Sequence, residues 1–488
     1  MEKYVKTRFR GGVLRAVAVT AAGVLVALGG AAGAGAVSPS ASRPVIDPDA
    51  SGSLTIHKYV TPDEDLDLPS DGMDHGELTG LDPLPDVTFT VKQVLGYDLT
   101  TNAGWAAAST LDPDTAAEGD FGVVREVTTT AAGTAVATGL PVGVYLVTET
   151  VYPAGTTPVN PFLITVPLTN PTNDAEWVYD VHVYPKNAVT TATKTVDDSS
   201  AVSVGDTVTW TILADIPDVA VIDGYKITDR LDTKLDHVST AVTLENGGTL
   251  DAGDYQLGFD ATTRTVTVLF TPSGLATLVE HSRDRVQVVI TTTVNAIGEI
   301  ANEALVFPNL PSFEIEPGEP GGPTVTPEVE SKWGNVTLLK VAEDGGALLP
   351  GAEFAVYLSR ADAVSGTGAI RSGTTGADGS LTFTGLRYSG WADGASVAPG
   401  EAGYQSYWIV ETKAPDGFEL LAAPIEVVVD SGDQLVDYTI ENVATNAGFT
   451  LPLTGGTGTV VITAAGLLLL TGAALLAFRA RRRETARA

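Results

Sequence analysis

Three residues on apolar segments in the last third of the chain could form a covalent bond with one another. Lys340 ends one such segment, Glu411 interrupts a second, and Asn442 lies at the end of a third. If the first and last segments pair as strands, Lys340 and Asn442 can meet inside a sandwich, with Glu411 on a facing strand. Burial would shift the lysine toward its neutral, nucleophilic form and the glutamate toward its protonated form.

The amine could then attack the Asn442 carboxamide while the carboxyl group shuttles protons, which gives a Lys–Asn isopeptide bond and ammonia. Fixed proximity would replace activation of the leaving group. The spacing alone also fits a second interpretation, in which the lysine is solvated, the glutamate is paired and the asparagine belongs to a turn.

The segments that would position these residues have the pattern of β-strands. Apolar residues alternate with Thr or other polar residues over 87–91, 265–268 and 286–294, and Gly, Pro, Asp and Asn punctuate the chain at short intervals. No long amphipathic helix is predicted between the two ends of the chain. Many short strands without helices predict an all-β protein built of tandem immunoglobulin-like β-sandwiches.

The chain divides into three units of sandwich size, which we place at residues 37–187, 188–330 and 331–446. A Pro-, Gly- and Glu-rich segment precedes the last unit. The first and third units share a weak repeat, because each has a strand ending in Lys, then Leu-Pro and an apolar strand, then a Glu on an apolar strand. The corresponding positions are Lys58 and Lys340, Leu84-Pro85 and Leu349-Pro350, and Glu149 and Glu411. Such repetition indicates one module used twice.

Composition limits the functions that the chain can have. It contains no cysteine, so an exported chain of this size would be stabilised without disulfides. Between the basic ends, 18 basic residues stand against 58 acidic ones, which disfavours binding to nucleic acid or anionic lipid. No hydrolase triad or cofactor motif is present, so we predict no cofactor.

The sequence also predicts no metal site. The five histidines show no metal-ligand spacing. The acidic stretch within 63–77 lacks the spacing of a calcium loop, so we expect a solvated loop there.

Both ends of the chain carry export signals. Residues 1–36 combine a basic start, an apolar run and a small-residue site, which predicts a secretory signal peptide. Residues 460–478 hold no charged side chain and as a transmembrane helix would span roughly 30 Å. The arginines that follow place the short tail in the cytoplasm.

The sequence Leu451-Pro452-Leu453-Thr454-Gly455 stands before this apolar segment, and together they make up the terminal region 447–488. The string resembles the LPxTG cell-wall sorting signal of Gram-positive surface proteins. The resemblance implies that a sortase cleaves between Thr454 and Gly455 and passes the threonine carbonyl to an amine.

Two further motifs resemble those of sortase-assembled Gram-positive pilins. Residues 177–187 match WxxxVxVYPKN at every specified position, which implies that Lys186 is the amine that accepts Thr454 of another subunit. Residues 407–418 resemble the E-box YxLxETxAPxGY, with Phe418 in place of the final Tyr. The resemblance implies collagen-adhesin B-type sandwiches for the first and third units and an A-type sandwich for the middle unit.

The same resemblance implies internal isopeptide bonds, each promoted by an acid. In the third unit the bond would join Lys340 to Asn442 with Glu411 as the acid, and in the middle unit Lys194 to Asn302 with Asp229. In the first unit the corresponding set is Lys58, Asn187 and Glu149. Some members of the family crosslink this unit and others do not, so that bond stays open here.

We therefore predict a backbone subunit of a covalently polymerised pilus, with no enzymatic activity beyond a single self-crosslinking turnover. Its expected partners are other copies of itself, pilus and housekeeping sortases, tip and base pilins, peptidoglycan and host surface ligands. It would be secreted and anchored in the cell wall after a transient membrane tether. The alternative is a monomeric wall-anchored adhesin that binds host matrix, because its sandwiches and tail would look the same.

Overall fold

The computed structural model describes most of the chain between its two ends, namely residues 45–62, 70–76, 78–173, 176–343, 346–432 and 436–445. Residues 1–45 and 46–488 form two separate units, and the following concerns the second. The predicted signal peptide, the sorting motif, the predicted transmembrane helix and the acidic residues 63–67 lie outside the described residues. Within the described ranges, every helix is too short or too polar to cross a membrane.

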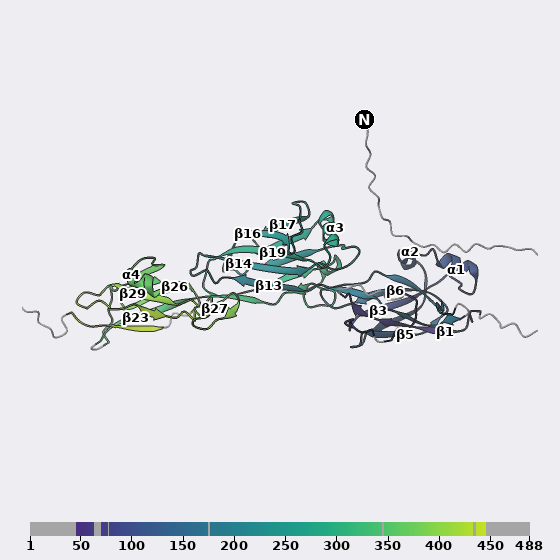
Figure 1. Ribbon diagram of the computed structural model, residues 1–488, viewed down its shortest axis with the longest axis horizontal. Coiled ribbons are helices and arrows are strands. Elements are labelled where there is room, and N and C mark those ends of the chain that lie inside the picture. Colours follow the sequence, from purple (N-terminus) through teal and green to yellow (C-terminus); the bar gives the residue numbers. More distant parts are fainter. Residues whose placement is uncertain are drawn as a thin grey trace, which may run out of the picture. The chain divides into compact units, whose positions relative to one another are not determined.

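The second unit contains three large hydrophobic cores, which define three modules (Figure 1). The first module comprises the elements from β1 to β12, the middle module those from β13 to β22, and the third module those from β23 to β31. Central residues of the cores are Leu54, Phe89 and Tyr145 in the first, Trp210, Ile212 and Val288 in the middle, and Val336, Phe354 and Tyr407 in the third.

The first module has two main sheets with the strand orders β11-β1-β5 and β4-β3-β6-β8. A small sheet, β2-β12-β7, continues from the ends of β1 and β11, and β9 pairs with β10. The elements are β1 (Ser51–His57), β2 (Tyr59–Val60), β3 (Thr88–Val94), α1 (Asn102–Ala108), α2 (Pro113–Ala117), β4 (Phe121–Thr128), β5 (Thr134–Pro141), β6 (Gly143–Val151), β7 (Thr156–Thr157), β8 (Phe162–Val166), β9 (Leu168–Thr169), β10 (Trp177–Val178), β11 (Asp180–Val183) and β12 (Lys186–Val189).

The middle module is a second sandwich, with the strand orders β13-β14-β19-β16 and β17-β18-β15-β21-β22. Its elements are β13 (Ala192–Asp197), β14 (Thr207–Asp215), β15 (Lys226–Arg230), β16 (Leu235–Leu244), β17 (Tyr255–Asp260), β18 (Thr265–Phe270), α3 (Pro272–Glu280), β19 (Arg285–Val294), β20 (Gly298–Asn302), β21 (Ala304–Phe307), the short 3-10 helix η1 (Pro311–Glu314) and β22 (Thr324–Val325).

The third module is built on β23, which pairs with β20, β26 and β31, while a second sheet has the order β25-β24-β29-β30. Its elements are β23 (Val329–Ala342), β24 (Glu353–Tyr357), α4 (Arg360–Ser365), β25 (Arg371–Thr374), β26 (Ser380–Arg387), β27 (Trp391–Ala392), β28 (Ala395–Ser396), β29 (Tyr407–Lys413), β30 (Ile425–Val427) and β31 (Tyr438–Asn442).

Strand β23 belongs to two modules at once. Its first residues pair with β20 of the middle module, from Val329 to Trp333, and its later residues pair with β26 from Trp333 onward. Trp333 is fully buried in the middle core, although it lies on the first strand of the third module. The middle and third modules are therefore joined by an uninterrupted strand.

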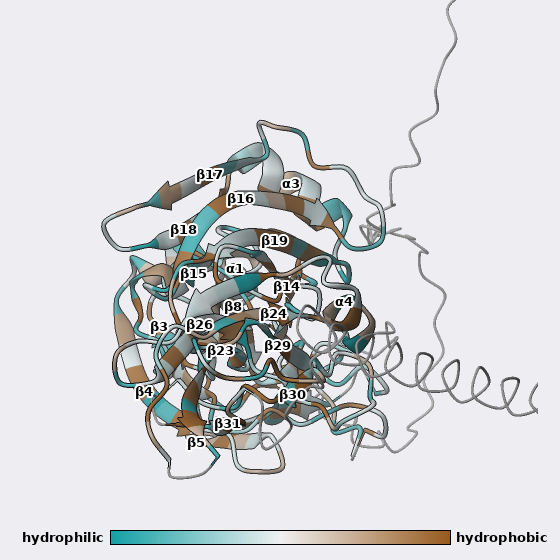
Figure 2. Ribbon diagram, turned by 90° about the vertical axis from the view of Figure 1, so that its left-hand side faces the viewer, coloured by the Kyte–Doolittle hydropathy of each residue, from teal (hydrophilic) through white to brown (hydrophobic). Residues whose placement is uncertain are grey.

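Alternation of side chains explains why these segments form strands. Along β14 and β19, every second residue is buried, as expected of strands with one face on a core. Figure 2 shows the corresponding brown and teal patches along strands such as β16 and β17. The strands predicted at 87–91, 265–268 and 286–294 are confirmed as β3, β18 and β19.

The all-β prediction is confirmed as well. The longest α-helix among the described residues, α3, has nine residues. It begins after Thr271, whose hydroxyl accepts a hydrogen bond from the Gly274 N–H, and Pro272 occupies its first turn. Short capped helices of this kind connect strands and form no layer of their own.

Candidate functional site

Lys340, Glu411 and Asn442, the third triad, lie together inside the third module. Strand β23 runs parallel to β31, and Glu411 comes from β29 in the other sheet. Lys340 Nζ donates a hydrogen bond to Asn442 Oδ1 and lies 3.6 Å from Glu411 Oε1. Asn442 Nδ2 donates to the two carboxylate oxygens of Glu411 at 2.9 and 3.0 Å. At most 2% of each residue is exposed.

Burial controls the electrostatics of the third triad. Desolvation lowers the pKa of Lys340, although the nearby Glu411 acts in the opposite direction. The amine lies 5.8 Å from the centre of the Phe354 ring. The carboxylate of Glu411 accepts a further hydrogen bond from the Leu421 N–H at 2.9 Å. The lysine is thus biased toward the neutral form that can act as a nucleophile.

Lys58, Glu149 and Asn187, the first triad, have an equivalent arrangement in the first module. Lys58 Nζ donates to Glu149 Oε1 and, at 2.5 Å, to Asn187 Oδ1. Asn187 Nδ2 donates to Glu149 Oε2 at 2.7 Å. The first and last strands are again parallel, since β1 pairs with β11 and β2 with β12. The structure therefore brings together the set that the sequence left open.

Burial lowers the pKa of the lysine more in the first triad than in the third. Desolvation lowers the pKa of Lys58 to about 8, against the pull of Glu149. Desolvation also raises the pKa of Glu149, although Lys58 opposes it. The Phe89 ring lies 5.7 Å from the amine, and the Val159 N–H donates to Asn187 Oδ1 at 2.9 Å.

Lys194, Asp229 and Asn302, the middle triad, are also buried; Lys194 and Asp229 are hydrogen-bonded, and Asn302 lies near enough to Asp229 to oppose the rise in its pKa. Lys194 Nζ donates to Asp229 Oδ2 at 2.5 Å and to the Glu303 carbonyl at 3.3 Å. Among the described residues, both polar atoms of the Asn302 amide and Asp229 Oδ1 lack a hydrogen-bond partner. Desolvation raises the pKa of Asp229 and lowers that of Lys194.

A buried polar atom without a hydrogen-bond partner destabilises the folded chain. A covalent bond from Lys194 to Asn302 would change the surroundings of the Asn302 side-chain amide. The Trp210 ring lies 5.7 Å from the Lys194 amine. An aromatic ring thus accompanies the lysine of every triad.

The arrangement in each triad is suited to amide exchange. In such an exchange a neutral Nζ would attack the side-chain carbonyl carbon of Asn, the carboxyl group would carry a proton from the attacking nitrogen to the leaving one, and ammonia would depart. The N–H groups of Val159 and Leu421 were not found from the sequence, because backbone contacts leave no residue pattern. Phe89 and Phe354 could have been found, since each lies five positions after the Leu of the repeated Leu-Pro pair.

Lys186 and Asn187 are neighbours on β12 and lie in opposite environments. Asn187 is fully buried in the first triad, whereas Lys186 is partly exposed. Lys186 lines two cavities of about 510 and 410 Å³, one shared with His182 and Tyr184, the other with Asn160 and Asp218. The lysine predicted as an acceptor is therefore accessible to a second molecule.

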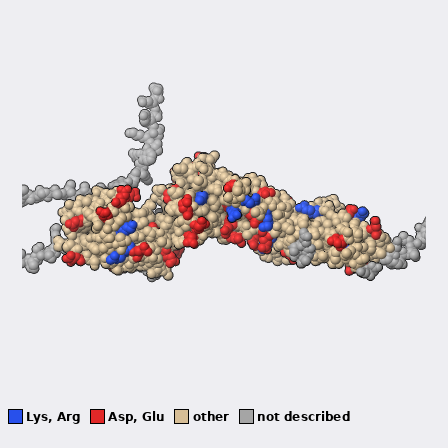
Figure 3. Space-filling view, turned by 180° about the vertical axis from the view of Figure 1, so that it is seen from behind, with Lys and Arg blue, Asp and Glu red and all other residues tan. Residues whose placement is uncertain are grey.

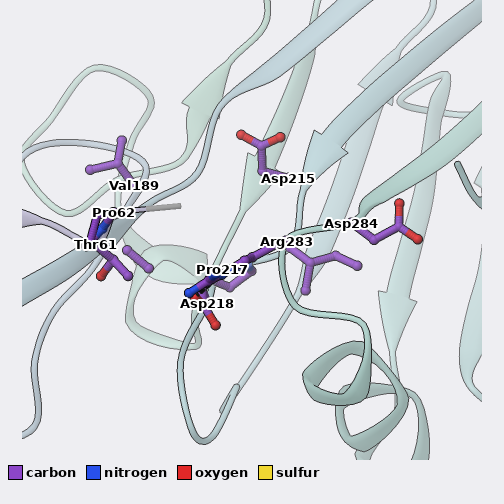
Figure 4. Close-up of a pocket in the computed structure, with 10 residues that line it drawn as sticks. Thr61, Pro62, Val189, Asp215, Pro217, Asp218, Arg283 and Asp284 are labelled. Atoms are coloured by element: carbon purple, nitrogen blue, oxygen red, sulfur yellow. Dashed lines mark hydrogen bonds and ion pairs between the residues drawn. The ribbon is translucent and has the colours of Figure 1, made fainter. Parts of the chain in front are cut away.

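A smaller cavity of about 180 Å³ contains no triad residue. Figure 4 shows Thr61 and Pro62 on one side of it and Asp215 and Asp218 on the other. Arg283 donates to Asp218 at 2.6 Å, so the cavity is bordered by an ion pair. Over the face shown in Figure 3, acidic side chains are scattered among fewer basic ones without forming a basic patch, in keeping with the net charge of −32.

Known families match three parts of the chain. A family described as "Gram-positive pilin subunit D1, N-terminal domain" matches residues 49–188, one described as "Prealbumin-like fold domain" matches residues 334–444, and one described as "LPXTG cell wall anchor motif" matches residues 444–485.

Relatives of the whole chain are also known. The chain is 33% identical to the fimbrial subunit type 1 of Actinomyces viscosus, over 98% of both chains. It is 33% identical to the fimbrial subunit type 2 of Actinomyces naeslundii, over 90% of this chain and 92% of the relative. The solved structure of the full-length major pilin SpaD from Corynebacterium diphtheriae is 28% identical, with a TM-score of 0.65 over 82% of this chain and 98% of that one.

Proposed function

The chain belongs to the family of sortase-assembled Gram-positive fimbrial subunits, and on that premise we propose that successive copies are joined from Thr454 of one to Lys186 of the next. As a member of this family it is a backbone subunit of a surface pilus and is anchored in the cell wall. Each joint would be a heterologous, head-to-tail contact, so the filament stays open at both ends.

The position of Lys186 carries the proposal. Its side chain is partly exposed beside two cavities, while Asn187 turns into the core. Pro185 precedes Lys186 and has no N–H for a sheet hydrogen bond. Lys186 is the first residue of β12, the last strand of the first module. A primary amine at such a place can receive an acyl group from an enzyme-bound threonine without opening a core.

The reaction at the joint balances without a further reactant. Sortase would cleave the bond between Thr454 and Gly455 and hold the threonine carbonyl as an activated acyl group. The Lys186 amine would then attack this carbonyl, lose a proton and displace the enzyme group that carried it. The products are an isopeptide bond and the released segment from Gly455 to Ala488.

We propose that all three triads form internal isopeptide bonds and that the subunit performs no other chemistry. Burial of the three lysines and their contacts with an acid support this proposal. The division into modules at 37–187, 188–330 and 331–446 stays part of it, as does removal of residues 1–36 on export.

The proposed bond between Thr454 and Lys186 of successive copies implies the other partners of the chain. A pilus sortase would polymerise the subunits, and a housekeeping sortase would pass the last Thr454 to peptidoglycan. Tip and base pilins would occupy the two ends of the filament, where a head or a tail is left without a partner copy. Host surface ligands would meet the polymer from outside.

The proposal is tested in a host that supplies a pilus sortase. Boiled wall extracts should give a ladder of high-mass species with the wild-type chain and a single band with Lys186→Arg, which keeps the charge and length but not the amine chemistry. Lys413→Ala is the matched control, because Lys413 is an exposed lysine that pairs with Glu353, and its ladder should persist. A wild-type chain without a ladder, or a ladder unchanged in Lys186→Arg, would contradict the joint.

A further inference from the structure

We propose that His57, His182 and Asp74 form a binding site for one Zn²⁺ ion on the outer face of the first module. These residues are far apart in the sequence, which explains why spacing predicted no metal site. Their ligand atoms lie within 4.8 Å of one another in the folded chain. The proposal does not depend on the role of Lys186.

Strand register places the two histidines side by side. In the parallel pair of β1 and β11, His182 is opposite Thr55, and His57 is two residues farther along β1. Side chains two apart lie on the same face of a strand, and the intervening Ile56 is buried in the first core. Both imidazoles therefore lie on the face turned away from that core.

The distances suit a small ion. His57 Nε2 and His182 Nδ1 are hydrogen-bonded at 3.0 Å, a contact that the ion would replace, and His182 Nδ1 is 3.8 Å from Asp74 Oδ1. Ligands at about 2 Å from a tetrahedral zinc ion lie roughly 3.3 Å from each other. The Asp74 side chain is 60% exposed, so a small rotation of it can close the remaining gap.

The groups around the histidines lie where groups that orient the rings lie in known metal sites. Asp180 Oδ2 lies 3.6 Å from Nε2 of His182, the nitrogen that faces away from the proposed ion. A carboxylate behind a ligating histidine is the usual arrangement for orienting the ring. The Tyr184 ring stacks on His57, with centroids 4.6 Å apart and planes 9° apart.

The segment that carries Asp74 is held against β11. The His182 N–H donates to the Gly72 carbonyl at 2.9 Å, and the His75 N–H donates to the Tyr184 hydroxyl at 2.7 Å. Gly72 has φ of +77°, and a Cβ at this position would lie 2.4 Å from the Leu168 side chain. The positive φ favours glycine at this position, and the two hydrogen bonds keep Asp74 near the histidines.

The ligand set determines the metal. Two imidazoles and one carboxylate favour zinc over calcium and magnesium, which prefer oxygen ligands. Three protein ligands leave a fourth position for water. The ion would tie segment 70–76 to the strand that leads to Lys186, at the border of the cavity that Asp71, His182 and Lys186 line together.

Zinc chloride titrated into the full chain in detergent, followed by calorimetry, tests the site. We expect one Zn²⁺ per chain, with the dissociation constant raised at least about tenfold in His57→Gln and in His182→Gln. His237→Gln is the matched control, because His237 lies in the middle module and stacks on Phe259; its zinc binding should equal that of the wild type. Calcium chloride should give no comparable heat.

Asp74→Asn covers the case in which a histidine variant fails to fold, because Asp74 is exposed and its loss leaves the sheet intact. This variant should also bind zinc more weakly. Absence of zinc binding by the wild-type chain would overturn the proposal. So would a folded histidine variant with the wild-type dissociation constant, or, if neither histidine variant folds, an Asp74→Asn chain with that constant.

Discussion

The first and third triads share a plan but direct their backbone donors to different groups. In both, a lysine near the end of the opening strand meets an asparagine on a parallel closing strand, beneath a phenylalanine ring. In the first triad the Val159 N–H donates to the oxygen of Asn187 and also acts on the pKa of Glu149, whereas in the third the Leu421 N–H donates to the carboxylate of Glu411.

This difference separates two ways of promoting one reaction. A donor on the Asn187 oxygen stabilises the negative charge that develops there when the amine attacks. A donor on Glu411 instead holds the carboxyl group in a fixed orientation beside Lys340 and Asn442. The two triads thus share the burial that lowers the pKa of the lysine and differ in the group to which the backbone N–H donates.

The largest expected effect is the loss of a crosslink. The bonds would close loops between residues 129 and 102 positions apart, and by analogy with disulfides each contributes about 4–5 kcal/mol to the free energy of unfolding of its module. Lys58→Ala and Lys340→Ala should therefore destabilise the first and third modules by similar amounts, measured by urea unfolding.

Intact mass provides the control for that comparison. The wild-type chain should lack one ammonia for each bond, and Glu149→Gln or Glu411→Gln, which keep the lysine and asparagine, should each recover one. An unmodified mass for the wild-type chain would rule the bonds out. Recovery in only one of the two variants would show that the acids are not equivalent.

The next effect is a dependence of stability on pH that appears only without the bond. Asn187→Ala leaves Lys58 as a buried amine, with a folded pKa of about 8 against an ordinary value of 10.5. Between these values the unfolded chain binds a proton that the folded chain does not, so the variant should gain on the order of 3 kcal/mol as the pH rises through this window. Below pH 8 both states are protonated and the gain is absent.

The wild-type chain is the reference for this measurement, because an amide nitrogen does not titrate. Urea unfolding at pH 7.5 and pH 10 should show the rise in Asn187→Ala beyond any change in the wild type. In the third triad, Asn442→Ala should show a rise of the same sign, since burial also lowers the pKa of Lys340. Equal pH dependence in variant and wild type would mean that Lys58 is not a buried neutral amine.

The smallest expected effect concerns the two aromatic rings. A ring over an amine stabilises its charged form, so burial and not the ring should keep the lysine reactive. Phe89→Leu and Phe354→Leu should each cost about 1 kcal/mol of unfolding free energy and leave the bond intact. Recovery of an ammonia in either variant, measured by intact mass, would assign the ring a role in the reaction.

The all-β fold and most of the residues that meet in the triads could be predicted from the sequence. Alternation predicted β3, β18 and β19, and the repeat located Lys58 and Glu149 beside their counterparts in the third module. The sequence could not locate the donor N–H of Val159, because a loop conformation places it there. It also could not pair His57 with His182, because strand register brings together residues 125 positions apart.

The continuous strand β23 determines how tension would pass through a subunit that is joined to its neighbours at Lys186 and Thr454. Tension that enters a copy at Lys186 would pass into the middle module and then along β23 to Lys340. From there the crosslink to Asn442 would carry it directly toward Thr454, so the residues between 340 and 442 would bear no load. The first module before Lys186 would lie outside the loaded path altogether, free to present its surface while the filament is pulled.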